Sequence, residues 1–276
     1  MKKQNSDSPV FELEKVSYYY RNQQALEDIS LKISKGERLI ILGANGSGKS
    51  TLLKMLDGLY FPSKGSIKAF GVKIDADFFQ NEENFYDFRK KVGFVFQDPD
   101  VQLFSPTVWD EVIFAPLHLG FSNSEVLRRA KTALKLLDIE HLKNRPPYLL
   151  SGGEKKRVAL ATVLAFNPEV WLFDEPTASL DPRSQSRFLD FLDTLSDRGN
   201  TVVIATHDLS IVEDMADRVL VLSEEHKMVR LGKPMNILED IPFLSKHNLV
   251  HDHRHKHKKE THKHLHIHVT DHEHKD

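Results

Sequence analysis

The stretch that decides the fold is GANGSGKS, residues 43–50, which fits the pattern G-x-x-x-x-G-K-[ST]. It follows the apolar run 39–42, a predicted strand, and precedes a leucine-rich segment that predicts a helix. Backbone N–H groups of such a loop surround phosphates, Lys49 adds a positive charge, and the Ser50 hydroxyl is a ligand for Mg²⁺. An ordinary glycine-rich turn is the competing interpretation, but the frame and context favour a nucleoside triphosphate site. Its predicted residues are Gly43, Ala44, Asn45, Gly46, Ser47, Gly48, Lys49, Ser50 and Thr51.

A second apolar run delivers two carboxylates. Residues 170–173 (VWLF) predict a buried strand that leads into Asp174 and Glu175. Ligands of open α/β sheets bind at the carboxyl ends of the strands. Asp174 is therefore predicted to hold Mg²⁺, and Glu175 to orient and polarise an attacking water. Alone, such a pair is often a helix cap, but together with the lysine loop it favours ATP chemistry.

The remaining patterns alternate between strand and helix, which favours an α/β core with a parallel sheet. The predicted strands are 11–16, 29–33, 39–42, 67–70, 94–96, 170–173, 201–205 and 218–222. Residues 98–166 are mainly helical in pattern, and 183–195 predict a further helix. The polar segment 75–91 is predicted to be a surface excursion.

Composition excludes several classes of protein. The chain has 276 residues, with 38 Lys and Arg against 40 Asp and Glu, so no global basic field attracts nucleic acid. The absence of cysteine excludes a disulfide scaffold, a Cys-ligated zinc site and a thiol nucleophile. Residues 1–9 are polar, unlike a secretory signal, and no apolar run reaches the ~20 residues that a membrane helix needs.

Histidine is the unusual residue type, since ten of the 15 histidines lie in the last 26 residues. Imidazole suits Ni²⁺, Co²⁺ and Zn²⁺, so the tail predicts a metal-binding segment that stores, delivers or senses an ion. An inert solvated tail and an expression remnant are the alternatives. The candidate ligands are His251, His253, His255, His257, His262, His264, His266, His268, His272 and His274.

Residues 150–154 (LSGGE), followed by KKRVA, resemble the signature motif of ABC-type ATPases. The other motifs of that family occur along the chain in the family's order, and the resemblance covers about residues 10–240. Tyr20 resembles the aromatic residue that stacks on adenine, Gln97 the Q-loop glutamine, and His207 the switch histidine. Taken singly, these three are ordinary strand, turn and cap residues. Ser179 and Asp181 match the D-loop.

The resemblance implies a P-loop NTPase core of ABC type, with an antiparallel β subdomain and an inserted helical subdomain at about residues 98–166. The ATPase domain would cover residues 10–244, between a flexible N-terminus (1–9) and a disordered His-rich tail (245–276). Glu175, His207 and Gln97 would be catalytic, and Ser50, Gln97 and Asp174 would hold Mg²⁺.

The resemblance also implies that two chains close head-to-tail over two ATP molecules. One chain has no need of two anion sites for one triphosphate. Ser151, Gly152, Gly153 and Glu154 would therefore bind the ATP of the partner, which is either a second copy or a different ABC ATPase. Glu154 stands where the family more usually has glutamine.

Residues 97–108 (QDPDVQLFSPTV) are similar to energy-coupling-factor importers, especially the ATPases for cobalt and nickel uptake. The implied partners are an integral membrane scaffold and a substrate-capture subunit, which would hold the chain at the cytoplasmic face of the membrane. Three alternatives stay open at this point: an importer for a vitamin or another metal, a soluble ABC ATPase acting on nucleic acid or ribosomes, and a metal-storage protein. The slight acidity and the lack of a long coiled-coil insertion disfavour a nucleic acid partner.

Overall fold

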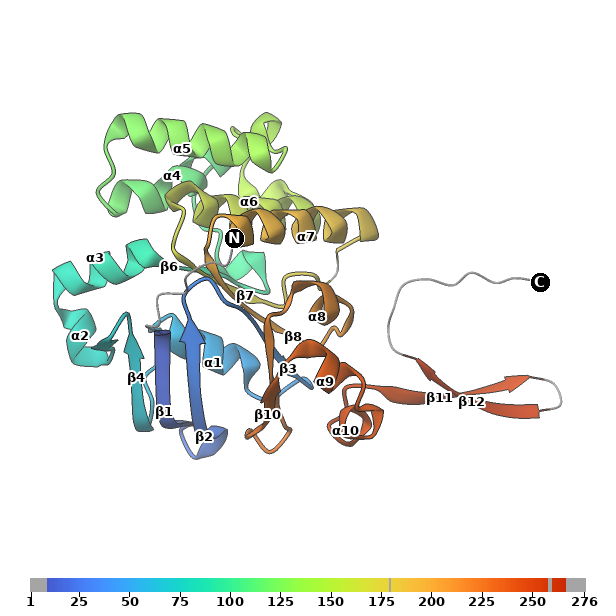
Figure 1. Ribbon diagram of the computed structural model, residues 1–276. Coiled ribbons are helices and arrows are strands. Elements are labelled where there is room, and N and C mark those ends of the chain that lie inside the picture. The colour runs from blue at the N-terminus through green and yellow to red at the C-terminus, as the bar shows by residue number, and fades with distance from the viewer. Residues whose placement is uncertain (1–8, 179, 258–259, 267–276) are drawn as a thin grey trace.

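The computed structural model describes residues 9–178, 180–257 and 260–266, and the side chains among them up to Val250. Its central element is a six-stranded sheet in the order β10-β9-β3-β8-β7-β6 (Figure 1). The five strands from β9 to β6 are parallel, and β10 pairs antiparallel with β9. The strands are β3 (Arg38–Gly43), β6 (Val92–Val95), β7 (Val170–Asp174), β8 (Thr201–Thr206), β9 (Arg218–Leu222) and β10 (Met228–Gly232).

The parallel strands are apolar between their end residues because both faces of the sheet are covered. Strand alternation sends Ile40 and Leu42 into one hydrophobic cluster and Leu39 and Ile41 into another. The first cluster lies against the large helices, and the second against the smaller sheet and α1 (Lys49–Leu56). The carboxyl ends of β3, β8 and β7 therefore meet at one edge, between two well-packed layers.

The smaller sheet is antiparallel, in the order β2-β1-β4-β5. Its strands are β1 (Pro9–Tyr20), β2 (Gln23–Ser34), β4 (Lys64–Ala69) and β5 (Val72–Lys73). Alternating residues such as Leu13, Leu31 and Ile67 point into the second cluster. This sheet is the antiparallel β subdomain of the predicted fold class, which the structure confirms.

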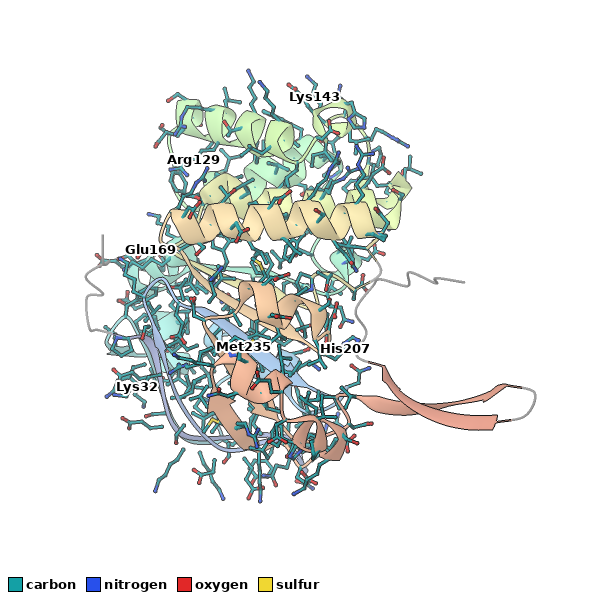
Figure 2. All side chains as sticks on the ribbon, turned by 45° about the vertical axis from the view of Figure 1, so that its right-hand side comes forward. Lys32, Arg129, Lys143, Glu169, His207 and Met235 are labelled. Atoms are coloured by element: carbon teal, nitrogen blue, oxygen red, sulfur yellow. The ribbon has the colours of Figure 1, made fainter. Side chains whose placement is uncertain are left out.

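The helices between β6 and β7 form a separate layer (Figure 1). They are η1 (Pro99–Val101), α4 (Val108–His118), α5 (Asn123–Leu136), η2 (Glu140–Leu142), η3 (Pro147–Leu149) and α6 (Gly152–Phe166). In Figure 2, Arg129 and Lys143 lie on this helical half of the molecule, and Lys32, His207 and Met235 on the other half. α7 (Pro182–Asp197) follows β7 and runs beneath α6.

The chain ends in short elements: α8 (Ser210–Met215), α9 (Pro234–Leu238), α10 (Ile241–Lys246), β11 (His251–His257) and β12 (Glu260–His266). The backbones of β11 and β12 pair as an antiparallel hairpin. The alternating His-X-His pattern has the period of a strand. The predicted disorder of the tail at residues 245–276 stays a prediction, because residues 258–259 and 267–276 lie outside the described residues. Of the predicted flexible N-terminus, residues 1–8 lie outside the described residues, and β1 begins at Pro9.

The segment predicted as a surface excursion forms two helices, α2 (Ala76–Gln80) and α3 (Glu82–Lys91), whose residues are exposed or partly exposed apart from Phe88. Both begin at side-chain caps, from Asp75 and Asn81. The rings of Phe79 and Phe88 meet edge-to-face at 5.0 Å, and Phe88 is buried. Aromatic packing thus anchors a segment whose average polarity hides its four phenylalanines.

Asp57 and Arg89 form a buried ion pair that connects α1 to α3. An Asp57 carboxylate oxygen lies 2.8 Å from Arg89 Nη1, which also donates to the Asp57 carbonyl at 2.8 Å. The Arg89 guanidinium lies over the Phe79, Phe85 and Phe88 rings at 5.4–5.7 Å. Burial outweighs the arginine and raises the pKa of Asp57 to about 6.

This pKa predicts that the Asp57 carboxylate costs stability at neutral pH. Because the folded-state pKa lies above the ordinary value of 3.8, the contribution to unfolding free energy is full below pH 3.8 and is lost as the pH rises through 6. The loss is about 3 kcal/mol. Denaturant unfolding of the wild type and Asp57→Asn between pH 4 and 7.5 measures it, because other carboxylates cancel in the difference. A difference that does not change with pH contradicts the prediction.

Candidate functional site

The loop at residues 43–50 connects β3 to α1, as the sequence predicts. Gly48 has φ +103°, and a Cβ there would lie 2.3 Å from the Ala25 carbonyl oxygen, so only glycine fits. α1 starts directly after Gly48 with no side-chain cap. The first N–H groups of α1 are therefore free of side-chain partners and, together with the helix dipole, favour an anion at this point.

Lys49 is buried in the loop, and its side chain curls back over it. Nζ donates to the Gly43 carbonyl at 2.8 Å and the Ala44 carbonyl at 3.1 Å, and lies 3.4 Å from Glu175 Oε1. Burial lowers the pKa of Lys49, although the Glu175 carboxylate beside it opposes this shift. The loop thus holds a positive charge where phosphates would bind, with Glu175 as its present anionic partner.

Ser50 and Asp174 provide neighbouring oxygen ligands. The Ser50 hydroxyl donates to Asp174 Oδ1 at 2.8 Å, across the gap between α1 and the end of β7. Burial raises the pKa of Asp174, and the Ser50 hydrogen bond partly offsets this shift. A hydroxyl and a carboxylate are the hard oxygen donors that Mg²⁺ takes beside nucleotide phosphates, so this pair fits the ion.

Glu175 lies at the centre of a hydrogen-bonded group at the ends of β7 and β8. The Thr206 hydroxyl donates to Oε2 at 3.2 Å, and Nδ1 of His207 lies 3.0 Å from Oε1. The Glu175 backbone has φ +46°, and its N–H donates to the Ala205 carbonyl at 2.9 Å. The Glu175 side chain is 6% exposed and the His207 ring 53%, so a water beside His207 could reach this carboxylate.

Tyr20 is the candidate for adenine stacking, and the structure brings it to the first turn of α1. Its hydroxyl lies 3.1 Å from the Thr51 hydroxyl. The ring meets Tyr18 and Tyr60 edge-to-face, whereas Tyr18 stacks flat on Tyr60 with ring centroids 5.3 Å apart. Tyr20 is 40% exposed, so its ring remains accessible to a base. The stacking role stays a prediction.

The signature residues start α6. Ser151 is the N-cap and forms a capping box with Glu154. Among the described residues, no atom lies within 4 Å of a Cβ built at Gly152 or Gly153, so this part of the structure leaves the helix end open to an approaching group. Asp181 of the D-loop caps α7, accepting from the Ser184 N–H at 3.0 Å. Ser179 lies outside the described residues.

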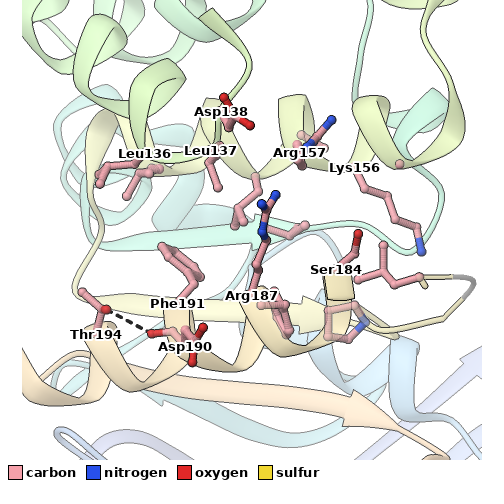
Figure 3. A pocket seen from close by; sticks show the side chains of 18 of the residues that line it. Leu136, Leu137, Asp138, Lys156, Arg157, Ser184, Arg187, Asp190, Phe191 and Thr194 are labelled. Atoms are coloured by element: carbon pink, nitrogen blue, oxygen red, sulfur yellow. Dashed lines mark hydrogen bonds between the residues drawn. The ribbon is translucent and has the colours of Figure 1, made fainter. Parts of the chain in front are cut away.

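A cavity of about 530 Å³ lies between the helical layer and α7 (Figure 3). Gln97 and Glu175 both line it, together with Gly153 of the signature. Figure 3 shows the Arg187 side chain extending from α7 towards α6, on which Arg157 lies. The cavity therefore joins the Gln97 side chain, the Glu175 carboxylate and the start of α6 in one connected space.

Sequence reasoning missed two residues that order this region. The Gln102 side-chain amide donates to the Ala159 carbonyl and the Thr162 hydroxyl, both at 2.9 Å, and accepts from the Phe96 N–H at 3.2 Å. It thereby ties the segment around Gln97 to the signature helix. Glu111 is buried and accepts two backbone N–H groups from the loop that follows Gln102. The repeated glutamine in QDPDVQLF was the available signal for Gln102.

Other predicted features fall outside this site. Among the described residues, no helix is long and apolar enough to cross a bilayer. Within the same part of the chain, no three histidine, aspartate or glutamate side chains group as a metal site. The histidine side chains of the tail lie outside the described side chains, so the predicted tail site stays a prediction.

The sequence and the fold of this chain were compared with those of known proteins. The family model described as "ABC transporter" matches residues 26–178. The chain is 44% identical to the nickel import ATP-binding protein NikO of Rhodobacter capsulatus, over 88% of this chain and 96% of that protein. It is 46% identical to the energy-coupling factor transporter ATP-binding protein EcfA of Carboxydothermus hydrogenoformans, over 77% of each. The solved structure of cbiO1 from Clostridium perfringens, part of the ABC transporter complex cbiONQ, superposes with a TM-score of 0.73 at 38% identity, covering 88% of this chain and 96% of that one.

Proposed function

The chain belongs to the ABC transporter family, and from this premise we propose that it is the ATP-hydrolysing subunit of an importer for nickel or cobalt ions. It is an ATP-binding subunit of the energy-coupling-factor importer type and uses ATP and Mg²⁺. One observation carries the ATP-hydrolysing part of the proposal: five side chains with the required chemistry lie together at the ends of three neighbouring strands. They are Lys49, Ser50, Asp174, Glu175 and His207.

Each of these side chains has a role in the proposed hydrolysis. The phosphates of ATP bind the loop at residues 43–50, where Lys49 and the start of α1 offset their charge. Ser50, Asp174 and Gln97 would hold Mg²⁺, which when bound neutralises charge on the phosphate oxygens. Glu175 accepts a hydrogen bond from the attacking water and orients it in line with the γ-phosphate. His207 holds Glu175 in position through its ring nitrogen.

A second copy, or a related ATPase, completes the site. The start of α6 is a second anion-favouring helix end, exposed and without a side chain on Gly152 or Gly153. A head-to-tail dimer places this helix end on the γ-phosphate of the ATP that the other chain binds. ATP then joins the two chains, and hydrolysis releases them.

An exposed apolar surface on the helical layer fits a membrane partner. Val101 is 69% and Phe104 68% exposed, and the ring of Phe104 meets the half-exposed ring of Phe114 edge-to-face at 4.9 Å. Glu111 fixes the Phe104 loop from beneath. A rigid apolar surface of this kind favours a docked helix, and we assign it to a cytoplasmic helix of the integral membrane scaffold.

Replacing Phe104 with aspartate is expected to reduce transport about tenfold, because docking would bury the new charge on an apolar surface. ATP hydrolysis measured without the membrane subunits should stay unchanged, since Phe104 lies outside the ATP site. Ion uptake and co-purification with the membrane subunits are the measurements. Leu127→Asp is the matched control, because Leu127 is 48% exposed on α5 outside this surface. Normal uptake by the Phe104 variant contradicts the assignment.

The tail supports the choice of cargo. Backbone pairing in the hairpin sets His251 opposite His266, His253 opposite His264, and His255 opposite His262. Imidazole suits Ni²⁺, Co²⁺ or Zn²⁺ as a ligand, so we propose that the histidine-rich tail collects the ion near the membrane. Nickel, cobalt and zinc uptake by the assembled transporter tests this, with the full chain and with a chain that ends before Val250.

The expected result is uptake of nickel or cobalt that depends on ATP, with a loss at low ion concentration when the tail is removed. ATP hydrolysis should survive the truncation, because every residue of the ATP site precedes residue 210. Failure of all three ions to enter would overturn the proposed cargo and favour a vitamin or another substrate. Equal uptake by both chains would overturn only the role of the tail.

A further inference from the structure

The helix α6, which begins with the signature residues, has the carboxylate of Glu154 in its first turn, at the end where a phosphate is proposed to bind. Oε2 of Glu154 accepts hydrogen bonds from the Ser151 N–H and from the Ser151 hydroxyl, both at 2.8 Å. These hydrogen bonds lower the pKa of Glu154, so its side chain is a carboxylate throughout the neutral range. The Ser151 hydroxyl can donate one hydrogen bond, and Glu154 accepts it.

This arrangement matters because a phosphate needs the same donor. An anion that binds at the start of α6 is attracted by the backbone N–H groups of the first turn and by the helix dipole. The approach is sterically open at Gly152 and Gly153. A negative charge already present in the first turn partly satisfies the dipole and repels a second anion.

We propose that the Glu154 carboxylate competes internally with the ATP phosphate for the Ser151 hydroxyl and so raises the ATP concentration needed to close the dimer. The inference rests on the proposed function, because the phosphate concerned belongs to ATP on the other chain. Glu154 acts as a positioning residue: it holds the hydroxyl in the open form and gives it up when the chains close.

A purely structural role for Glu154 has a built-in comparison in the same chain. α5 begins with the same capping box, in which the Ser122 hydroxyl donates to Glu125 Oε2 at 2.9 Å. That box caps a helix far from any proposed nucleotide contact. Glu125→Gln therefore reports what loss of charge from a capping box does to the fold alone, whereas Glu154→Gln reports this together with any effect on phosphate binding.

The experiment measures ATP-driven dimerisation in a Glu175→Gln background, in which hydrolysis is suppressed. Light scattering across ATP concentrations gives the half-point for dimer formation. Glu154→Gln should lower the half-point roughly tenfold at low salt, because glutamine keeps an oxygen acceptor for Ser151 but carries no charge. The difference should shrink in high salt, which screens charge repulsion. Glu125→Gln should leave the half-point unchanged.

An equal half-point for Glu154→Gln and its parent would overturn the inference, as would a higher one. A salt-independent difference would also overturn it, since the effect would then not be electrostatic. If the parent forms no dimer at saturating ATP, the proposed head-to-tail dimer fails, and this inference fails with it. The two failures are thus distinguished by the parent alone.

Discussion

Replacing Glu175 with glutamine is expected to slow ATP hydrolysis at least about 100-fold and to make the ATP-bound dimer accumulate. Glutamine has nearly the same shape, so the Thr206 and His207 contacts can persist. It lacks the carboxylate that orients and polarises the attacking water. ATP binding should remain, because Lys49 and the loop are unchanged. The Glu175 charge, which competes with phosphate for Lys49, is then absent. Phosphate release measures hydrolysis, a nucleotide-binding assay measures ATP binding, and the molecular size in the presence of ATP shows whether the dimer accumulates.

The matched control is Glu169→Gln. Glu169 is half-exposed and pairs with Lys35 at the surface, away from the ATP site. It should hydrolyse ATP at the wild-type rate. A Glu175→Gln chain that keeps more than about a tenth of the wild-type rate would show that another group orients the water, and the assignment of Glu175 would be wrong.

Gly153→Asp is the second change with a large expected effect. A Cβ at Gly153 meets nothing within 4 Å, so the fold should accept the side chain. The added carboxylate lies in the first turn of α6 beside Glu154 and repels the incoming phosphate. Hydrolysis should fall at least about 100-fold and ATP should no longer induce a dimer, while the isolated chain binds ATP as before.

Gly232→Asp is the control for this change, since a Cβ there also meets nothing within 4 Å and its φ is not positive. Thermal unfolding of both variants shows whether the fold survives, and nucleotide binding shows whether the loop at residues 43–50 is intact. Wild-type hydrolysis by Gly153→Asp would mean that no phosphate approaches this helix end.

The sequence predicted the parts of the site whose chemistry is local. GANGSGKS between a strand and a helix specifies a loop, a charge and a hydroxyl ligand within eight residues. The pairing of Ser50 with Asp174 was also predictable, because the parallel strands of one sheet end at the same edge. The contact of Lys49 with Glu175 was not, since it depends on side-chain orientations inside a packed core.

The missed features share a physical cause. Gln102 acts through hydrogen bonds to Ala159 and Thr162, which no periodicity reports. The helices of the segment 75–91 were not predicted, because its polar residues dominate the average and conceal the packing of Phe79 against Phe88. Long-range contacts of single side chains thus escape pattern reasoning even where the element types are predicted correctly.

In the proposed head-to-tail dimer, each ATP is hydrolysed between Glu175 of one chain and the signature residues of the other. Mixing the Glu175→Gln and Gly153→Asp chains tests it most directly, because each chain alone is inactive. In a mixed dimer, the Gly153→Asp chain supplies an intact Glu175 and the Glu175→Gln chain an intact signature, which together make one complete site. We expect ATP hydrolysis by the mixture to rise well above the sum of the two separate chains. The upper limit is about a quarter of the wild-type rate, which random pairing would give because half of the dimers would be mixed and each would have one working site of two. A mixture no more active than the sum of its two separate chains would contradict the account.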